Sequence, residues 1–182
     1  MANDGAILAI MMYPKPLEGR ATIAWRIAVW ALILTWGLAL SGVARAADGL
    51  VHAKNFQTDA RTAATRQVPI LVVFTTPDCP YCERVKHDYL IPMHKDPAYR
   101  KRVIIREVTI GSTGPLTDFD GKPTTEGAFA AAHKVFMVPT VQVFDTQGHD
   151  VGDAIVGLLI PDFYFGYLEN AIDAGVNKVR GK

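Results

Sequence analysis

The chain has 182 residues, of which 49% are hydrophobic and 20% charged, and its formal net charge is +1. This composition excludes a disordered chain, a collagen-like repeat and a coiled coil. The balanced charge gives no large basic face for nucleic acid. Two cysteines are too few for a disulfide-stapled mini-protein or for a structural zinc site of four thiolates.

The longest apolar stretch lies near the N-terminus. Residues 27–44 carry no charge and are flanked by Arg26 and Arg45. The tripeptide Ala-Arg-Ala that ends at Ala46 places small residues at positions −3 and −1 of a cut after Ala46. A basic flank, an apolar run and such a site are typical of a secretory signal peptide.

We therefore expect residues 1–46 to be a signal peptide and residues 47–182 to form the exported, periplasmic domain. Translation is expected to begin at Met11 or Met12, because the stretch before the apolar run is long for a signal peptide. An uncleaved membrane anchor is the alternative, since about 17–25 apolar residues can span a bilayer.

The residues after this segment alternate between helical and extended patterns. A β-branched and aromatic run without alternation, Val68–Phe74, indicates a central strand that is buried on both faces. In chain order we predict a helix over 49–66, a strand over 68–74, a helix over 80–90 that ends at Ile91-Pro92, a strand over 103–110, a loop over 111–126, a helix over 127–136, a strand over 138–144, its hairpin partner over 154–159 and a helix from Pro161. This order predicts an α/β three-layer sandwich with a central mixed sheet.

The last helix is expected to pack through an apolar stripe that recurs at helical spacing. Its predicted inward residues are Tyr164, Leu168, Ala171 and Ile172. Its other aromatic residues are also expected in the core: Phe163, Phe165 and Tyr167.

The one strong motif is Cys79-Pro80-Tyr81-Cys82, at the predicted junction between a buried strand and a helix. Helix N-terminal amides favour an anion, so the position predicts a reactive thiolate at Cys79. Cys82, one turn inward, is then in reach to resolve a mixed disulfide. Pro80 is tolerated in the first helical turn.

Two other interpretations of the cysteine pair stay open. One is a permanent structural disulfide, although a disulfide that closes so short a loop would stabilise the fold little. The other is half of a metal site, completed by histidines such as His94 or His133. Covalent haem attachment is excluded because Glu83, not histidine, follows Cys82.

Residues 74–82, Phe-Thr-Thr-Pro-Asp-Cys-Pro-Tyr-Cys, and the later Val138-Pro139-Thr140 resemble the thioredoxin-fold family. More narrowly, the chain resembles exported thioredoxin-like domains related to the catalytic domains of periplasmic disulfide isomerases. The resemblance covers about residues 52–176. It implies a thioredoxin-like fold and a thiol–disulfide oxidoreductase that uses Cys79 and Cys82 as its redox pair.

The resemblance also implies a substrate-binding element around Pro139. In the family this proline is cis and packs beside the cysteine pair, which leaves Val138 to offer backbone hydrogen bonds to a substrate peptide. Tyr81 is expected to shape the same groove. A trans proline at the start of an edge strand is the alternative for Pro139.

The chain departs from the family at Val73. Cytosolic thioredoxins carry a buried aspartate six residues before the first cysteine, and here that position is apolar. We therefore expect thiol exchange at Cys82 to need water or another acid. His87 lies about 12 Å along the helix from Cys79, too far for a direct base, and Glu83 is expected at the surface.

These observations predict an exported thiol–disulfide oxidoreductase, and more specifically a reductase of protein disulfides that receives electrons from a membrane thiol carrier. We expect a monomer that needs no cofactor and binds no nucleic acid. The alternatives are a metal-handling module that uses Cys79 and Cys82, or a peptide-binding module without redox turnover.

Overall fold

The computed structural model describes residues 49–158 and 160–181. The predicted signal peptide lies outside the described residues. The helices are α2 (Phe56–Arg66), α3 (Pro80–Val85), the π-helical turn η1 (Lys86–Leu90), α4 (Ile91–Lys95), α5 (Pro97–Arg100), α6 (Glu126–Ala132) and α7 (Pro161–Val179). The strands are β1 (Ile70–Thr75), β2 (Ile104–Thr109), β3 (Pro115–Thr117), β4 (Pro123–Thr125), β5 (Thr140–Phe144) and β6 (Ile155–Val156). Within these ranges no helix is long and apolar enough to span a membrane.

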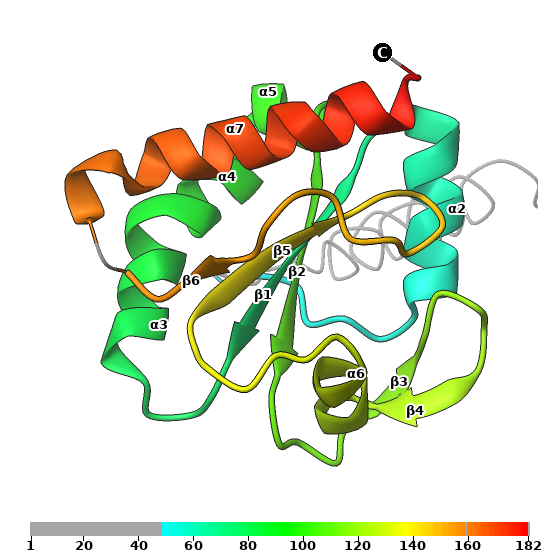
Figure 1. Ribbon diagram of the computed structural model, residues 1–182, viewed down its shortest axis with the longest axis horizontal. Helices are drawn as coiled ribbons and strands as arrows, with labels where there is room; N and C mark the ends of the chain where they lie inside the picture. Colours follow the sequence, from blue (N-terminus) through cyan, green and yellow to red (C-terminus); the bar gives the residue numbers. More distant parts are fainter. Residues whose placement is uncertain (1–48, 159, 182) are drawn as a thin grey trace, which may run out of the picture. The chain divides into compact units, whose positions relative to one another are not determined.

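A mixed four-stranded sheet in the order β2-β1-β5-β6 forms the middle layer (Figure 1). β1 runs parallel to β2 and antiparallel to β5, and β6 is antiparallel to β5. β1 is buried along its whole length, as its unbroken apolar sequence predicts. The predicted α/β sandwich with a mixed sheet is confirmed.

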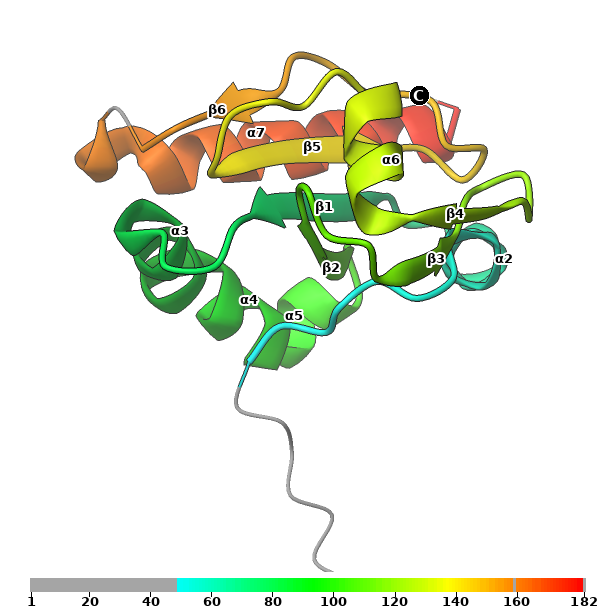
Figure 2. The same cartoon turned by 90° about the horizontal axis from the view of Figure 1, so that it is seen from below.

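Two apolar clusters, one on each face of the sheet, hold the helices in place. One joins Leu71 and Val73 of β1 to side chains of α3, α4 and α7, including Val85 and Leu168. The other joins alternate β1 residues to α2 and α6, where the Phe56 and Phe129 rings stack with centroids 4.6 Å apart. The helices therefore form the two outer layers (Figure 2).

The first helix begins later than predicted. Residues 49–55 are mostly extended, and His52 bridges in parallel to Glu107 of β2, so the prediction of helix from Gly49 is wrong. The helix starts at Phe56 because the Asn55 side chain accepts a hydrogen bond from the Thr58 N–H and caps it.

The helix after the cysteine motif continues past Pro92 instead of ending at Ile91-Pro92. The turn η1 is π-helical, and the Ile91 N–H donates to the Lys86 carbonyl five residues earlier. Pro92 then occupies the first turn of α4, where a missing N–H is tolerated. The helical run therefore reaches Lys95.

The predicted loop over residues 111–126 contains a short hairpin. β3 and β4 pair antiparallel through Pro115–Thr125 and Leu116–Thr124. Leu116 is buried and joins the cluster around Phe56, which gives the hairpin a hydrophobic anchor. Pro115 and Pro123 each form one end of these three-residue strands, where strand proline is tolerated.

The predicted helix from Pro161 is confirmed, and Tyr164, Leu168 and Ile172 are buried as expected. Its other aromatics are not in the core: Phe163, Phe165 and Tyr167 are exposed. They lie outside the 3.6-residue stripe that faces the sheet.

Candidate redox site

The cysteine motif stands where β1 passes into α3. β1 is buried throughout, and the chain leaves it through a turn in which Asp78 adopts a left-handed φ of 56°. Cys79 is the N-cap of α3, with extended backbone angles, and Pro80 fills the first helical turn. The rigid strand and the helix thereby fix the position of Cys79, as the sequence predicted.

Cys79 and Cys82 form a disulfide across Cα atoms 5.2 Å apart. Cys79 is partly exposed, whereas Cys82 is completely buried. The Cys82 N–H donates to the Cys79 Sγ at 3.1 Å. An amide aimed at this sulfur stabilises a thiolate there once the disulfide is reduced.

Pro139 follows a cis peptide bond, so the predicted isomer is confirmed. Thr140 pairs with Phe74 near the end of β1, which places buried Pro139 level with the strand end that leads to Cys79. Both views show the start of β5 beside the loop before α3 (Figures 1 and 2). The Pro139 carbonyl accepts a 2.7 Å hydrogen bond from the Gly157 N–H.

Exposed apolar side chains adjoin both parts of this site. Tyr81 in the motif is 59% exposed, and Phe136 and Met137, just before the cis bond, are 73% and 63% exposed. The Thr140 hydroxyl donates to the Met137 carbonyl at 2.8 Å, which fixes the backbone of this segment. Exposed apolar groups rimming a reactive site are typical of a surface that binds other proteins.

A buried carboxylate lies one strand away from the position where the family has aspartate. Val73 pairs in register with Glu107 of β2, and Glu107 is 5% exposed. Its Oε1 accepts hydrogen bonds from the Thr75 hydroxyl at 2.9 Å and from Lys86 Nζ at 3.1 Å. The sequence indicates this group only through the charged Arg106-Glu107 pair inside an otherwise apolar strand, and Glu107 was not among the predicted site residues.

Lys86 connects this carboxylate to the active-site helix. It follows Cys82 by four residues, so both lie on one helical face, and its backbone N–H donates to the Cys82 carbonyl. Burial disfavours the ammonium, but the hydrogen bonds that Lys86 Nζ donates to the Glu83 and Glu107 carboxylates outweigh this effect and raise the pKa of Lys86. The hydrogen bond from Lys86 in turn lowers the pKa of Glu83.

Glu83 and His87 lie at the surface, as expected. His87 Nε2 is 3.3 Å from Glu83 Oε2, and both side chains are more than half exposed.

The histidines of the metal alternative do not gather at the cysteines. His94 lies on α4, and His133 packs its ring 4.5 Å from that of Phe129 and 3.5 Å from an Asp150 oxygen. In the described part of the chain, no three His, Cys, Asp or Glu side chains are placed to hold a metal ion together.

A mixed sheet between helical layers, a cysteine pair at a strand-to-helix junction and a cis-proline beside it define a domain of thioredoxin type. The family model for the thioredoxin-like domain matches residues 56–172. The chain therefore belongs to the thioredoxin-like domain family.

Solved structures of thioredoxin type are similar to this chain at low identity. A thioredoxin-fold protein from Helicobacter pylori is 20% identical, with a TM-score of 0.48, over 63% of this chain and 73% of that one. Trxlp from Edwardsiella tarda is 22% identical, with a TM-score of 0.43, over 61% and 91%. Oxidized thioredoxin O2 from Arabidopsis thaliana is 18% identical, with a TM-score of 0.44, over 69% and 93%. None of the curated proteins matches the chain.

Proposed function

We propose that this domain is an exported thiol–disulfide oxidoreductase that reduces disulfides in other proteins. One observation carries the proposal: Cys79 caps α3 and is partly exposed, while its disulfide partner Cys82 is buried one turn inward. A permanent structural disulfide does not require one exposed and one buried cysteine, whereas a nucleophilic thiol and a resolving thiol do.

The reaction transfers two electrons in two exchanges. The Cys79 thiolate attacks one sulfur of a substrate disulfide, forms a mixed disulfide and expels the first substrate thiolate. The Cys82 thiolate then attacks the Cys79 sulfur and expels the second substrate thiolate. The substrate is reduced, and the Cys79–Cys82 disulfide is restored.

Cys82 must lose its proton before it attacks, and Glu107 is the group proposed to accept it. Val73 provides no carboxylate, but Glu107 lies on the adjacent strand under the helical turn that follows Cys82, held there by Lys86. The Lys86 ammonium, 3.1 Å from Glu107 Oε1, would favour a negative charge on this carboxylate.

The exposed apolar side chains of Tyr81, Phe136 and Met137 would receive the substrate polypeptide, whose backbone would hydrogen-bond to Val138. A thiol carrier in the membrane would reduce the disulfide again. We propose that the domain acts as a monomer in the periplasm after removal of residues 1–46.

Trapping of mixed disulfides tests the two cysteine roles. Cys82→Ser should accumulate mixed disulfides with substrate proteins, because no internal thiol remains to displace them. Cys79→Ser should trap almost none, because buried Cys82 is shielded. Non-reducing gels of periplasmic fractions would show the adducts. Equal numbers from both variants, or failure of the wild type to reduce insulin, would refute the proposal.

The direction of electron flow follows from the redox potential of the pair. If the domain is a reductase, equilibration with glutathione or dithiothreitol buffers should give the cysteine pair a reduction potential of about −270 mV, the value of thioredoxin. A potential near −120 mV would identify an oxidant instead.

Mass spectrometry of the exported protein should find Ala47 or a neighbour at its N-terminus, and retention of residues 27–44 would show an anchor.

A further inference from the structure

A hollow lies at the edge of the sheet, away from the cysteines. It has a volume of about 450 Å³ and is lined by the first half of β2, the outer side of α2 and the helices α4 and α5. β2 is the edge strand, and Ile104 pairs with Ile70 at the start of β1. Cys79 follows the other end of β1, so this hollow is not part of the redox site.

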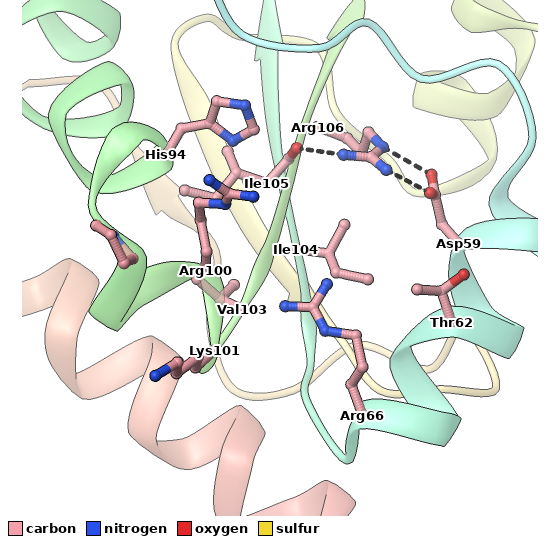
Figure 3. A pocket seen from close by; sticks show the side chains of 11 residues that line it. Asp59, Thr62, Arg66, His94, Arg100, Lys101, Val103, Ile104, Ile105 and Arg106 are labelled. Atoms are coloured by element: carbon pink, nitrogen blue, oxygen red, sulfur yellow. Dashed lines mark hydrogen bonds and ion pairs between the residues drawn. The ribbon is translucent and has the colours of Figure 1, made fainter.

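Three guanidinium groups from three separate elements surround the Ile104 side chain in this hollow (Figure 3). Arg66 comes from the last turn of α2, Arg100 from the end of α5 and Arg106 from β2. Lys101 and His94 add further basic groups to the lining. Asp59 is the one acidic residue among the lining side chains.

Asp59 neutralises only one of these arginines. Its two carboxylate oxygens accept hydrogen bonds from Arg106 Nε at 2.8 Å and Nη2 at 2.5 Å, and Arg106 Nη1 also donates to the Ile105 carbonyl. Arg106 is therefore held in a fixed orientation. Within residues 49–158 and 160–181, the side chains of Arg66 and Arg100 have no hydrogen-bond or ion-pair partner.

The backbone of the edge strand adds a donor to the floor of the hollow. Ile104 donates its N–H inward to Pro69, and alternate β2 residues therefore turn their N–H groups to the outer edge. The outward N–H of Glu107 is taken by Val51, and that of Thr109 by Glu126. The outward N–H of Ile105 has no partner in the described part of the chain.

The hollow also has a positive electrostatic environment. Burial lowers the pKa of His94, and the positive charges of Arg106 and Arg100 lower it further. The direction of this shift agrees with the geometry of the hollow, in which Asp59 pairs with Arg106 and leaves the other basic side chains without an acidic partner among the lining residues.

We propose that this hollow, called here the β2-edge pocket and defined by Arg66, Arg100, Arg106, Ile104 and Ile105, binds a small ligand that carries two or more carboxylate or phosphate groups. Guanidinium groups recognise both anions through paired N–H donors. The apolar side chains of Val103 and Ile104 would contact the body of the ligand. The volume lies in the range of about 300–1,000 Å³ typical of small-molecule sites.

Titration with pyrophosphate and with citrate tests the site, because the two probes separate a phosphate ligand from a carboxylate ligand. We expect at least one to shift the amide NMR signals of Ile105 and Arg100 saturably. The double variant Arg66→Gln/Arg100→Gln should weaken that binding at least tenfold, since it removes two charge-assisted contacts. Insulin reduction should stay unchanged in this variant, because neither residue touches the cysteine site.

The matched control is Arg61→Gln/Arg180→Gln, which removes the same charge from exposed arginines outside the pocket. It should leave the affinity within twofold of the wild type. Equal weakening by both double variants would show non-specific attraction and overturn the proposal. If neither probe gave saturable shifts, the proposal would also be overturned. If only hexaglutamate bound saturably, the result would overturn the proposal as well, because it would favour an acidic protein partner over a small ligand.

Discussion

Lys86 Nζ lies 3.1 Å from Glu107 Oε1, beneath the helical turn that follows Cys82. Thr75, the last residue of β1, adds its hydroxyl to the same carboxylate oxygen. A strand end, the neighbouring strand and the active-site helix thus meet at one buried carboxylate. We propose that this carboxylate takes the role for which Val73 offers no group.

Glu107→Gln should slow the resolving step without changing the first attack by Cys79. The substitution keeps the shape of the side chain but replaces the carboxylate with an amide, so it removes the proton acceptor that we propose for Cys82. We expect release of glutathione from the mixed disulfide on Cys79 to slow at least tenfold at pH 7. Quenched-flow mass spectrometry measures this step separately from the alkylation rate of Cys79.

The same variant should be less stable by about 1–3 kcal/mol, because Lys86 keeps only Glu83 as a partner. Asp145→Asn is the matched control, since it removes a second buried carboxylate that lies after β5 and bonds to the backbone of Gln147 and His149. If Asp145→Asn slowed the resolving step as much as Glu107→Gln, the slower step would be explained by lost stability, and the proposed role of Glu107 would be refuted.

The exposed apolar segment before Pro139 should affect protein substrates selectively. Phe136→Ser/Met137→Ser should lower kcat/KM for insulin reduction about tenfold, since burial of one such side chain contributes about 1.5–3 kcal/mol. Reduction of a small aromatic disulfide should stay within twofold of the wild type. Phe165→Ser, an exposed aromatic that contacts Tyr99 on another surface, is the control. Parallel losses on both substrates would argue against a docking role.

Stability should depend on pH through His133. Burial among aromatic rings lowers the pKa of His133, although Asp150 opposes the shift. The unfolded chain, with a histidine pKa of about 6.5, then binds more protons than the folded chain, so stability falls as pH drops below about 6.5. Urea unfolding between pH 7 and pH 5 should show a shallower loss for His133→Gln than for the wild type. His87→Gln, at the surface, should retain the wild-type loss.

The sequence allowed prediction of the features that depend on neighbouring residues. The unbroken apolar run of β1, the cysteine motif after it and Pro80 in the first helical turn are local patterns with local causes. They were enough to infer a buried central strand and the position of Cys79, whereas the fold class was inferred from the order of all the predicted elements and from the family resemblance.

Features that arise between distant segments could not be inferred in the same way. Glu107 approaches Lys86 only because β2 lies beside β1, a pairing that sequence periodicity does not specify. Pro92 signals a helix end, but the π-helical turn before it makes room for the proline. The β2-edge pocket likewise needs α2, α5 and β2 to be brought together before Arg66 and Arg100 can face one hollow.

Two glycines of α7 should respond oppositely to alanine. A Cβ at Gly175 would lie 2.7 Å from Pro69 Cβ and 2.8 Å from Val143 Cγ1, whereas a Cβ at Gly166 would meet nothing within 4 Å. Gly175→Ala should therefore destabilise the domain by about 1–3 kcal/mol, because the buried side chains of Val143 in β5 and of Pro69, just before β1, must move. Gly166→Ala should stabilise it by about 0.5–1 kcal/mol, because alanine loses less backbone entropy in a helix.

Urea unfolding of both variants measures this difference, and the helix provides its own control. Both substitutions gain the same helix propensity, so the gap between them isolates the close approach of α7 to the sheet at Gly175. If Gly175→Ala were as stabilising as Gly166→Ala, α7 would have to lie farther from Pro69 and Val143 than these distances state. That result would also contradict the packing of Leu168 and Ile172 against the sheet, because this packing depends on the same position of α7.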